Sequence, residues 1–220
     1  MKPLNQYFDH TLLKPQATET EIMRLCDEAR EYQFCAVCVN SCYVPLAIKA
    51  LSGAEVKVAA VVGFPLGACT TPSKAFETES ACQCGASEID MVLNVGMLKS
   101  GNLDYVAKDI AAVVNTASSF DAKVKVILET CLLSDEEIIL ACQLAHDAGA
   151  HFVKTSTGFN SGGATTHHVH LMKKCVGDTM EVKASGGIRD YATAMAMIEA
   201  GADRLGASAS VDIMKSKKEH

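Results

Sequence analysis

The chain has 220 residues, 49% of them hydrophobic and 21% charged, and a formal net charge of −6. This composition is that of an ordinary globular protein with a sizeable core, and the absence of a basic stripe argues against a nucleic-acid partner. No apolar run is long enough to cross a bilayer, and residues 1–6 carry no apolar signal core. We therefore expect a cytoplasmic protein with no membrane partner.

Eight short apolar segments with the character of strands recur along the chain, separated by segments with helical spacing. The predicted strands are residues 7–11, 35–40, 56–63, 88–94, 123–129, 152–155, 182–185 and 204–206. A Gly-Ala pair precedes four of them, with the glycines at Gly53, Gly85, Gly149 and Gly201. Each glycine follows a helical stretch, where a left-handed residue is needed to end the helix. The repeated order of helix, glycine and strand indicates βα units.

The helices are predicted from their caps and from apolar residues at helical spacing. Capping boxes begin at Thr18 and Ser134, and Pro72 marks the first turn of another helix. Residues 103–114 carry a clear apolar stripe. Weaker helical patterns cover residues 165–175, 191–200 and 208–214.

Eight strands that alternate with helices in a chain of this length predict a single-domain (β/α)8 TIM barrel over residues 1–220. An open doubly wound sheet is the alternative, but it usually has fewer strands and a glycine-rich first βα turn. The first turn here, residues 9–15, contains no glycine. The barrel is therefore the favoured fold.

Charged residues interrupt three of the apolar strands. The alternation of a strand places Asp90, Lys154 and Lys183 in the barrel interior, at the strand ends where such barrels carry function. One carboxylate with two ammonium groups leaves a surplus positive charge, which is relieved if one lysine loses its proton and becomes a nucleophile. A purely structural ion triad is the alternative, although three interior charges at strand ends favour catalysis. Lys125 shows the same alternation and is expected to join them.

Two turns of small residues follow the last two strands. They contain Gly186 and Gly187 in the first turn, and Gly206 and Ser208 in the second. Loops at these positions commonly hold phosphate in barrels, and small residues let backbone N–H groups approach an anion. We expect a phosphate site here, with tight turns that bind nothing as the alternative.

Cysteines and histidines raise the question of a metal. The ten cysteines are scattered, and most fall in apolar patterns, as buried cysteines do. Cys35 and Cys38 form a C-x-x-C, but the second pair that a zinc ribbon needs is missing. His167, His168 and His170 lie at the start of a predicted helix, where the adjacent histidines are expected to point apart. We therefore interpret them as solvated surface and expect no metal site.

Five segments resemble the deoxyribose-phosphate aldolase family, and the likeness runs from Tyr7 to Ser210. They are residues 9–15 (DHTLLKP), 61–67 (VVGFPLG), 88–92 (EIDMV), 152–159 (FVKTSTGF) and 182–189 (VKASGGIR). The resemblance implies a class I aldolase of deoxyribose phosphate catabolism. Such an enzyme reversibly cleaves 2-deoxy-D-ribose 5-phosphate to acetaldehyde and D-glyceraldehyde 3-phosphate, with no metal or other cofactor.

The resemblance also implies roles for single residues. Lys154 becomes the Schiff-base lysine, Lys183 the neighbour that lowers the pKa of that amine, and Asp90 the proton donor or acceptor. The residues expected to bind substrate or phosphate are Thr157, Gly158, Gly186, Gly187, Gly206 and Ser208. The residues expected to line the pocket are Asp9, Thr11, Cys38 and Lys125. The implied partners are a small phosphorylated sugar, short aldehydes and a second copy of the chain in a homodimer.

The chain departs from some members of that family at three places. Phe159 stands where some relatives have a lysine, Ala209 stands where some have a second serine, and residues 217–220 (KKEH) replace a tyrosine-bearing tail. We therefore expect phosphate to depend more on backbone amides than on charge, and the tail to give no help with proton transfer.

Two other functions stay open at this point. A phosphosugar isomerase on the same fold would need a glutamate base and would not need two interior lysines. A phosphosugar-binding or thiol-redox regulator would leave Lys154 as an ion pair. Borohydride reduction with acetaldehyde separates these hypotheses, since only an aldolase gives a two-carbon adduct on Lys154.

Overall fold

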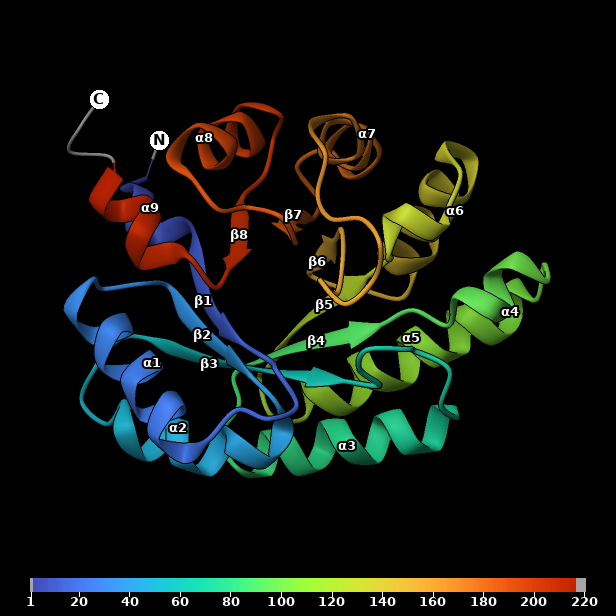
Figure 1. The fold of residues 1–220 in the computed structure, drawn as a ribbon. Helices are drawn as coiled ribbons and strands as arrows, with labels where there is room; N and C mark the ends of the chain where they lie inside the picture. The colour runs from blue at the N-terminus through green and yellow to red at the C-terminus, as the bar shows by residue number, and fades with distance from the viewer. Residues whose placement is uncertain (1, 217–220) are drawn as a thin grey trace.

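Eight parallel strands close into a barrel, and the helices lie around its outside (Figure 1). The structure is a computed structural model that describes residues 2–216. The strands pair in chain order and the last pairs with the first, so the predicted TIM barrel is confirmed. The strands are β1 (Phe8–Leu12), β2 (Ala36–Val39), β3 (Lys57–Val62), β4 (Glu88–Val92), β5 (Lys123–Ile127), β6 (Phe152–Lys154), β7 (Glu181–Ser185) and β8 (Arg204–Ala207).

Each predicted helix is present, and two short helices were not predicted. The helices of residues 2–216 are α1 (Glu19–Glu31), α2 (Val44–Ala50), α3 (Thr71–Gln83), α4 (Val95–Lys99), α5 (Leu103–Ser118), α6 (Asp135–Asp147), α7 (Thr166–Val176), α8 (Tyr191–Glu199) and α9 (Ser210–Ser216). The same residues also contain three short 3-10 helices, η1 (Leu4–Tyr7), η2 (Ser41–Tyr43) and η3 (Thr130–Leu132). The unpredicted helices, α2 and α4, have seven and five residues, too few to repeat an apolar spacing. The tail at residues 217–220 lies outside the described residues.

Both predicted capping boxes are formed. The hydroxyl oxygens of Thr18 and Ser134 accept hydrogen bonds from the backbone N–H groups of Glu21 and Glu137, each at 3.3 Å. Each glutamate returns a bond by accepting from the backbone N–H of its capping residue, at 2.8 Å for Thr18 and 2.9 Å for Ser134. Two otherwise unpaired backbone donors are satisfied at the start of each helix.

The four glycines of the Gly-Ala repeat all adopt the backbone conformation that was predicted for them. Their φ angles are +77° at Gly53, +103° at Gly85, +78° at Gly149 and +112° at Gly201. A side chain is disfavoured at such angles because its Cβ approaches the carbonyl oxygen. The repeat therefore marks the points where the chain leaves a helix and turns into the next strand.

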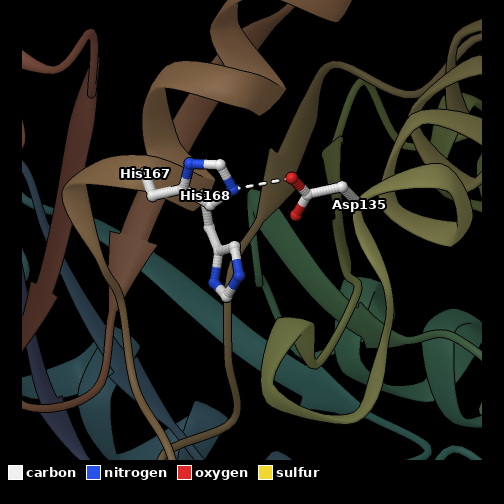
Figure 2. A group of neighbouring side chains, drawn as sticks. All are labelled: Asp135, His167 and His168. Carbon is white, nitrogen blue, oxygen red and sulfur yellow. Dashed lines mark hydrogen bonds and ion pairs between the residues drawn. The ribbon is translucent and has the colours of Figure 1, made fainter.

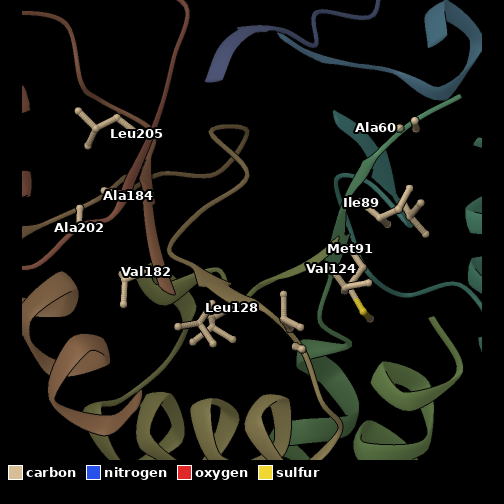
Figure 3. Packing of buried hydrophobic residues seen from close by; sticks show 14 of the residues in the cluster. Ala60, Ile89, Met91, Val124, Leu128, Val182, Ala184, Ala202 and Leu205 are labelled. Atoms are coloured by element: carbon tan, nitrogen blue, oxygen red, sulfur yellow. The ribbon is translucent and has the colours of Figure 1, made fainter. Parts of the chain in front are cut away.

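The apolar core forms a ring between the barrel and its helices. Alternate residues of each strand point outward into it, as Ile89 and Met91 of β4 and Val182 and Ala184 of β7 do (Figure 3). Inside the barrel the apolar residues form a much smaller cluster of Leu13, Cys38, Ala59 and Val61. The remaining interior positions are therefore available for polar side chains.

We predict that Gly149→Ala lowers the free energy of unfolding by about 1–2 kcal/mol, the cost of a left-handed alanine. The nearest atom to an added Cβ would be Val114 Cγ1 at 3.8 Å, so no clash adds to this cost. Gly96→Ala is the matched control because Gly96 lies within helix α4 with an ordinary φ. It should be neutral or stabilising by up to ~1 kcal/mol. Urea unfolding of the two variants measures both values, and equal changes would contradict the assignment.

Candidate active site

A cavity of about 330 Å³ opens at the carboxyl ends of β1, β6, β7 and β8. Its lining contains eight of the predicted site residues, which come from four different strand ends. They are Thr11, Lys154, Thr157, Gly158, Gly186, Gly187, Gly206 and Ser208. The predicted nucleophile and the two predicted phosphate turns therefore share one cavity.

Lys154 is the residue at which the cavity meets the charged interior of the barrel. It is the last residue of β6, only 2% of it is exposed, and it lines the cavity. Its Nζ donates to Oδ2 of Asp90 at 2.8 Å. A primary amine is thus held at the floor of a pocket that a small molecule can enter.

Asp90 is a single carboxylate that three lysines share. Lys125 donates to Oδ1 at 2.7 Å, while Lys154 and Lys183 both donate to Oδ2 at 2.8 Å. Asp90 is completely buried, so water does not screen these contacts. The structure brings together all four interior charges that the alternation of the strands predicted.

Asp9, Cys38 and Lys125 differ from the expectation that they line the pocket. All three have no exposed surface, and they are not among the residues that line the cavity. The physical reason is that side chains fill a barrel of eight strands in layers. They are packed in the ionic interior instead: Cys38 Sγ lies 3.9 Å from Asp90 Oδ2, and Lys125 lies within ion-pair distance of both Asp90 and Asp9.

Two charged residues of the interior, Glu88 and Arg204, were not predicted. Arg204 donates to Asp9 at 2.6 Å and to Glu88 at 3.1 Å, and Lys125 lies 2.5 Å from Glu88. The signal was available in the sequence, because Glu88 stands two residues before Asp90 on the same strand and must share its face. The predicted triad is therefore the upper part of a larger ionic cluster.

Opposite charges decide the protonation of this cluster. Burial alone would raise the pKa of Asp90, but Lys125, Lys154 and Lys183 outweigh it and hold the pKa well below its usual range. Burial would likewise lower the pKa of Lys183, but Asp9 and Asp90 raise it. Asp90 is thus a carboxylate and Lys183 an ammonium ion near neutral pH, as the electrostatic hypothesis requires.

The loop after β6 is held in place by a buried glutamate that the sequence reading did not single out. Glu129 accepts hydrogen bonds from both the hydroxyl and the backbone N–H of Thr157, the latter at 3.2 Å. Glu129 is itself left-handed, with φ +59°. The Thr157 hydroxyl also accepts from the N–H of Phe159 at 3.1 Å. Thr157 lines the cavity, but its hydroxyl is already used to shape the loop.

The loops after β6 and β7 approach each other closely. The N–H of Ala164 donates to the carbonyl oxygens of Ser185 and Gly186, each at 3.0 Å. A Cβ on Gly163 would lie 2.3 Å from the Gly186 oxygen, so only glycine fits there. Gly186 and Gly187 have φ angles of +84° and +81°, which glycine adopts without strain.

Phe159 forms an apolar edge to the cavity where some members of the resembled family carry a lysine. It lines the cavity and is 47% exposed. Its ring meets that of Phe64, from the loop after β3, edge to face at 5.2 Å between centroids. This part of the rim offers no charge to an anion.

His167 and His168 do not point apart, so that expectation is wrong. Their ring centroids lie 5.4 Å apart, and together with Asp135 they place ligand atoms within 4.8 Å of one another (Figure 2). In the part of the chain that the structure describes, this is the one group of three such residues that could hold a metal ion. Nε2 of His167 lies 2.8 Å from Asp135, and both side chains are largely exposed. None of the three lines the cavity at Lys154.

Within residues 2–216, no helix combines the length and the apolar character that a membrane span needs.

A family model described as "DeoC/LacD family aldolase" matches residues 4–216. A curated relative from Streptococcus gordonii, named deoxyribose-phosphate aldolase, is 58% identical over 214 residues, which are 97% of this chain and 96% of the relative.

Two solved structures show the same fold. A putative deoxyribose-phosphate aldolase from Coccidioides immitis has a TM-score of 0.95 and 45% identity, over 99% of this chain and 87% of the other. The tetrameric deoxyribose phosphate aldolase from Aeropyrum pernix has a TM-score of 0.92 and 35% identity, over 98% and 91%.

We predict that Cys38 stays unmodified when the native protein is treated with iodoacetamide near pH 8. Burial raises the pKa of its thiol to about 11, so the reactive thiolate is rarer than in a free cysteine at the same pH. Cys42, Cys84 and Cys175 are exposed and serve as internal controls that should react. Peptide mass spectrometry reads out each site, and denatured protein should be labelled at Cys38 as well. Rapid labelling of Cys38 in the native protein would contradict this prediction and support the thiol-redox hypothesis.

Proposed function

Because this chain belongs to the DeoC/LacD family of aldolases, we propose that it cleaves 2-deoxy-D-ribose 5-phosphate reversibly to acetaldehyde and D-glyceraldehyde 3-phosphate. The observation that carries this proposal is the amine of Lys154, which lines the cavity and contacts Asp90 at 2.8 Å. A lysine that loses its proton in such a site is a nucleophile for a carbonyl carbon. The proposed activity is therefore that of a class I aldolase.

In the proposed mechanism, the neutral amine of Lys154 attacks the aldehyde carbon of the open-chain sugar, and loss of water leaves a protonated imine. The hydroxyl on the third carbon then gives up its proton, and the bond between the second and third carbons breaks. The electron pair of that bond moves toward the imine nitrogen and leaves an enamine, while glyceraldehyde 3-phosphate departs. Protonation of the enamine and addition of water release acetaldehyde and restore the amine. The imine supplies the electron sink, so this chemistry uses no cofactor.

Asp90 is proposed to accept and return protons during these steps. Its Oδ2 is 2.8 Å from Nζ of Lys154, which is the distance at which a general acid or base works. Lys183 contacts the same oxygen at 2.8 Å. We propose that its positive charge favours the neutral form of the neighbouring amine.

The phosphate of the substrate is proposed to bind at the turns after β7 and β8. Gly186, Gly187, Gly206 and Ser208 all line the cavity. Their small size leaves the backbone N–H groups accessible to an anion. The rim at Phe159 offers no charge to the phosphate, but Lys14 and Arg189 also line the cavity and can add charge to what the backbone amides supply.

The two other hypotheses find less support. An isomerase would need a glutamate base in the cavity, whereas Glu129 is buried beneath the loop and occupied by Thr157. A thiol-redox regulator would need a reactive thiol, whereas Cys38 has no exposed surface. A homodimer and a cytoplasmic location belong to the same proposal, and sedimentation velocity would test the former.

Substitution of Lys154 and of its buried neighbour Lys183 tests the mechanism. Lys154→Ala should abolish turnover and the borohydride-trapped acetaldehyde adduct, because the imine-forming nitrogen is gone. Lys183→Leu keeps that nitrogen and removes the positive charge beside it. At neutral pH its rate should fall on the order of 10²-fold or more, because a rise of about two units in the pKa of Lys154 leaves ~1% as much free amine.

The pH dependence separates the two variants. Raising the pH should recover part of the loss in Lys183→Leu and none of it in Lys154→Ala, because only the former retains an amine that can lose its proton. Rates and trapped adduct should be measured up to about pH 9.5. Two variants that stay equally inactive over this range would mean that Lys183 takes part directly in the chemistry.

A charge introduced at the second turn tests the phosphate site. Ser208→Glu places a carboxylate on the cavity wall and should repel the phosphate group. KM should rise much more for deoxyribose 5-phosphate than for free deoxyribose. Ser80→Glu, on the exposed side of α3, is a control of equal charge that should alter neither KM. Equal effects of Ser208→Glu on both sugars would place the phosphate elsewhere.

A further inference from the structure

Arg204 is a buried arginine in the interior of the barrel, beneath the proposed catalytic amine. It opens β8 and is 4% exposed. Its guanidinium donates to Asp9 at 2.6 Å and to both oxygens of Glu88 at 3.1 and 3.3 Å. It also lies over the ring of Phe152, 5.3 Å from the centroid. None of these contacts reaches the cavity, and the proposed mechanism gives Arg204 no part.

Arg204 belongs to the same ionic cluster as Lys154. The strand register pairs Lys154 with Lys183 and Lys183 with Arg204, so three cations stand side by side on β6, β7 and β8. The carboxylates connect them, because Asp9 contacts both Lys183 and Arg204. Two residues, Asp9 and Lys183, therefore connect Arg204 to Asp90, the partner of Lys154.

The charges of this cluster can be counted. It has three carboxylates and four cations, all buried: Asp9, Glu88 and Asp90 against Lys125, Lys154, Lys183 and Arg204. With Lys154 neutral, three negative charges face three positive ones and the buried cluster is neutral. With Lys154 protonated, it carries one uncompensated positive charge. An uncompensated charge in the interior is costly, so the balance favours the neutral amine at Lys154.

Lys154 is the cation best placed to give up its proton. An arginine cannot do so in a protein. Lys125 lies within ion-pair distance of three carboxylates, Asp9, Glu88 and Asp90, and Lys183 of two, Asp9 and Asp90. Lys154 contacts only Asp90 among the described carboxylates within ion-pair distance. The surplus charge of the cluster therefore falls on the lysine that lines the cavity.

The surroundings of Arg204 supply no buried charge that would cancel this count. Besides the cluster, it faces the thiol of Cys35 before β2 and the amine of Lys2 before β1. Lys57 of β3 lies 3.6 Å from Glu88, but its side chain is 45% exposed, so water screens its charge. Cys38 of β2 faces Asp90 as a neutral thiol.

We infer that Arg204 is a positioning residue for this chemistry: its permanent charge balances Asp9 and Glu88, so that the neutral cluster is the one in which Lys154 is a free amine. This inference rests on the proposed function, because it concerns the same imine-forming amine. It predicts that the positive charge at position 204 is what affects imine formation, so that lysine can replace Arg204 and an uncharged residue cannot. Arg204 touches no substrate, yet its removal should act on the pH dependence of imine formation.

The test measures the rate of adduct formation between acetaldehyde and Lys154, trapped by cyanoborohydride, from about pH 5 to 10. Arg204→Met removes one positive charge, so the neutral cluster becomes the one with Lys154 protonated. The midpoint is the pH at which the trapping rate reaches half its maximum. In Arg204→Met it should rise by about one pH unit or more, which lowers the trapping rate at neutral pH about tenfold. Arg204→Lys keeps the charge and should keep the midpoint within a few tenths of a unit.

Glu88→Gln tests the same count from the other side. This variant removes a negative charge and should lower the midpoint. The double variant Arg204→Met with Glu88→Gln has two carboxylates against Lys125 and Lys183, which is again balanced when Lys154 is neutral. Its midpoint should return close to that of the unmodified protein. Lys57→Met, which removes an exposed cation beside the same Glu88, is the matched control and should cause no shift.

The outcomes separate the inference from the proposed function. If the unmodified protein forms no adduct on Lys154 at any pH, the proposed function fails. If it forms the adduct but Arg204→Met and Glu88→Gln leave the midpoint unchanged, the inference about Arg204 fails while the function stands. If Arg204→Met does not fold, the downward shift in Glu88→Gln decides alone, and an unchanged or higher midpoint there overturns the inference.

Discussion

The site depends on one buried carboxylate that three lysine side chains share. Asp90 accepts hydrogen bonds from Lys125, Lys154 and Lys183 at 2.7–2.8 Å and has no exposed surface itself. Asp90 alone cannot neutralise Lys125, Lys183 and Arg204, so Asp9 and Glu88 are needed as well, and Arg204 contacts both of those carboxylates. The polar interior of the barrel is thus a set of mutually dependent charges, which explains why it reaches so far below the cavity.

The placement of these charges inside the barrel also explains why the apolar core lies outside it. Because the interior is ionic, the apolar core that stabilises the protein lies between the strands and the helices. Outward residues such as Ile89 pack against helices, while the adjacent Asp90 points inward. Neighbouring residues of one strand therefore serve different purposes: one packs in the apolar core outside the barrel, and the next carries a charge inside it.

Much of this could be predicted from the sequence, because strand alternation is a strict geometric rule. It placed Asp90, Lys154 and Lys183 in one interior, and the Gly-Ala repeat located four of the turns. Contacts between distant strands could not be predicted in this way. Arg204 with Glu88 joins β8 to β4, and Glu129 with Thr157 joins two loops. Pairs of this kind depend on the closure and stagger of the barrel, which no local pattern contains.

The close approach of Gly163 to Gly186 has a consequence for redesign of the cavity. The loops after β6 and β7 share backbone hydrogen bonds through Ala164 and have no space for a side chain between them. They therefore form one rigid wall, and a change of length in either loop would displace both. The backbone of Phe159 belongs to this wall, but its side chain packs on Phe64 of the loop after β3 and can be replaced without a change of loop length. A cavity for larger or less polar aldehydes is thus better sought by substitution on a fixed backbone than by exchange of loops.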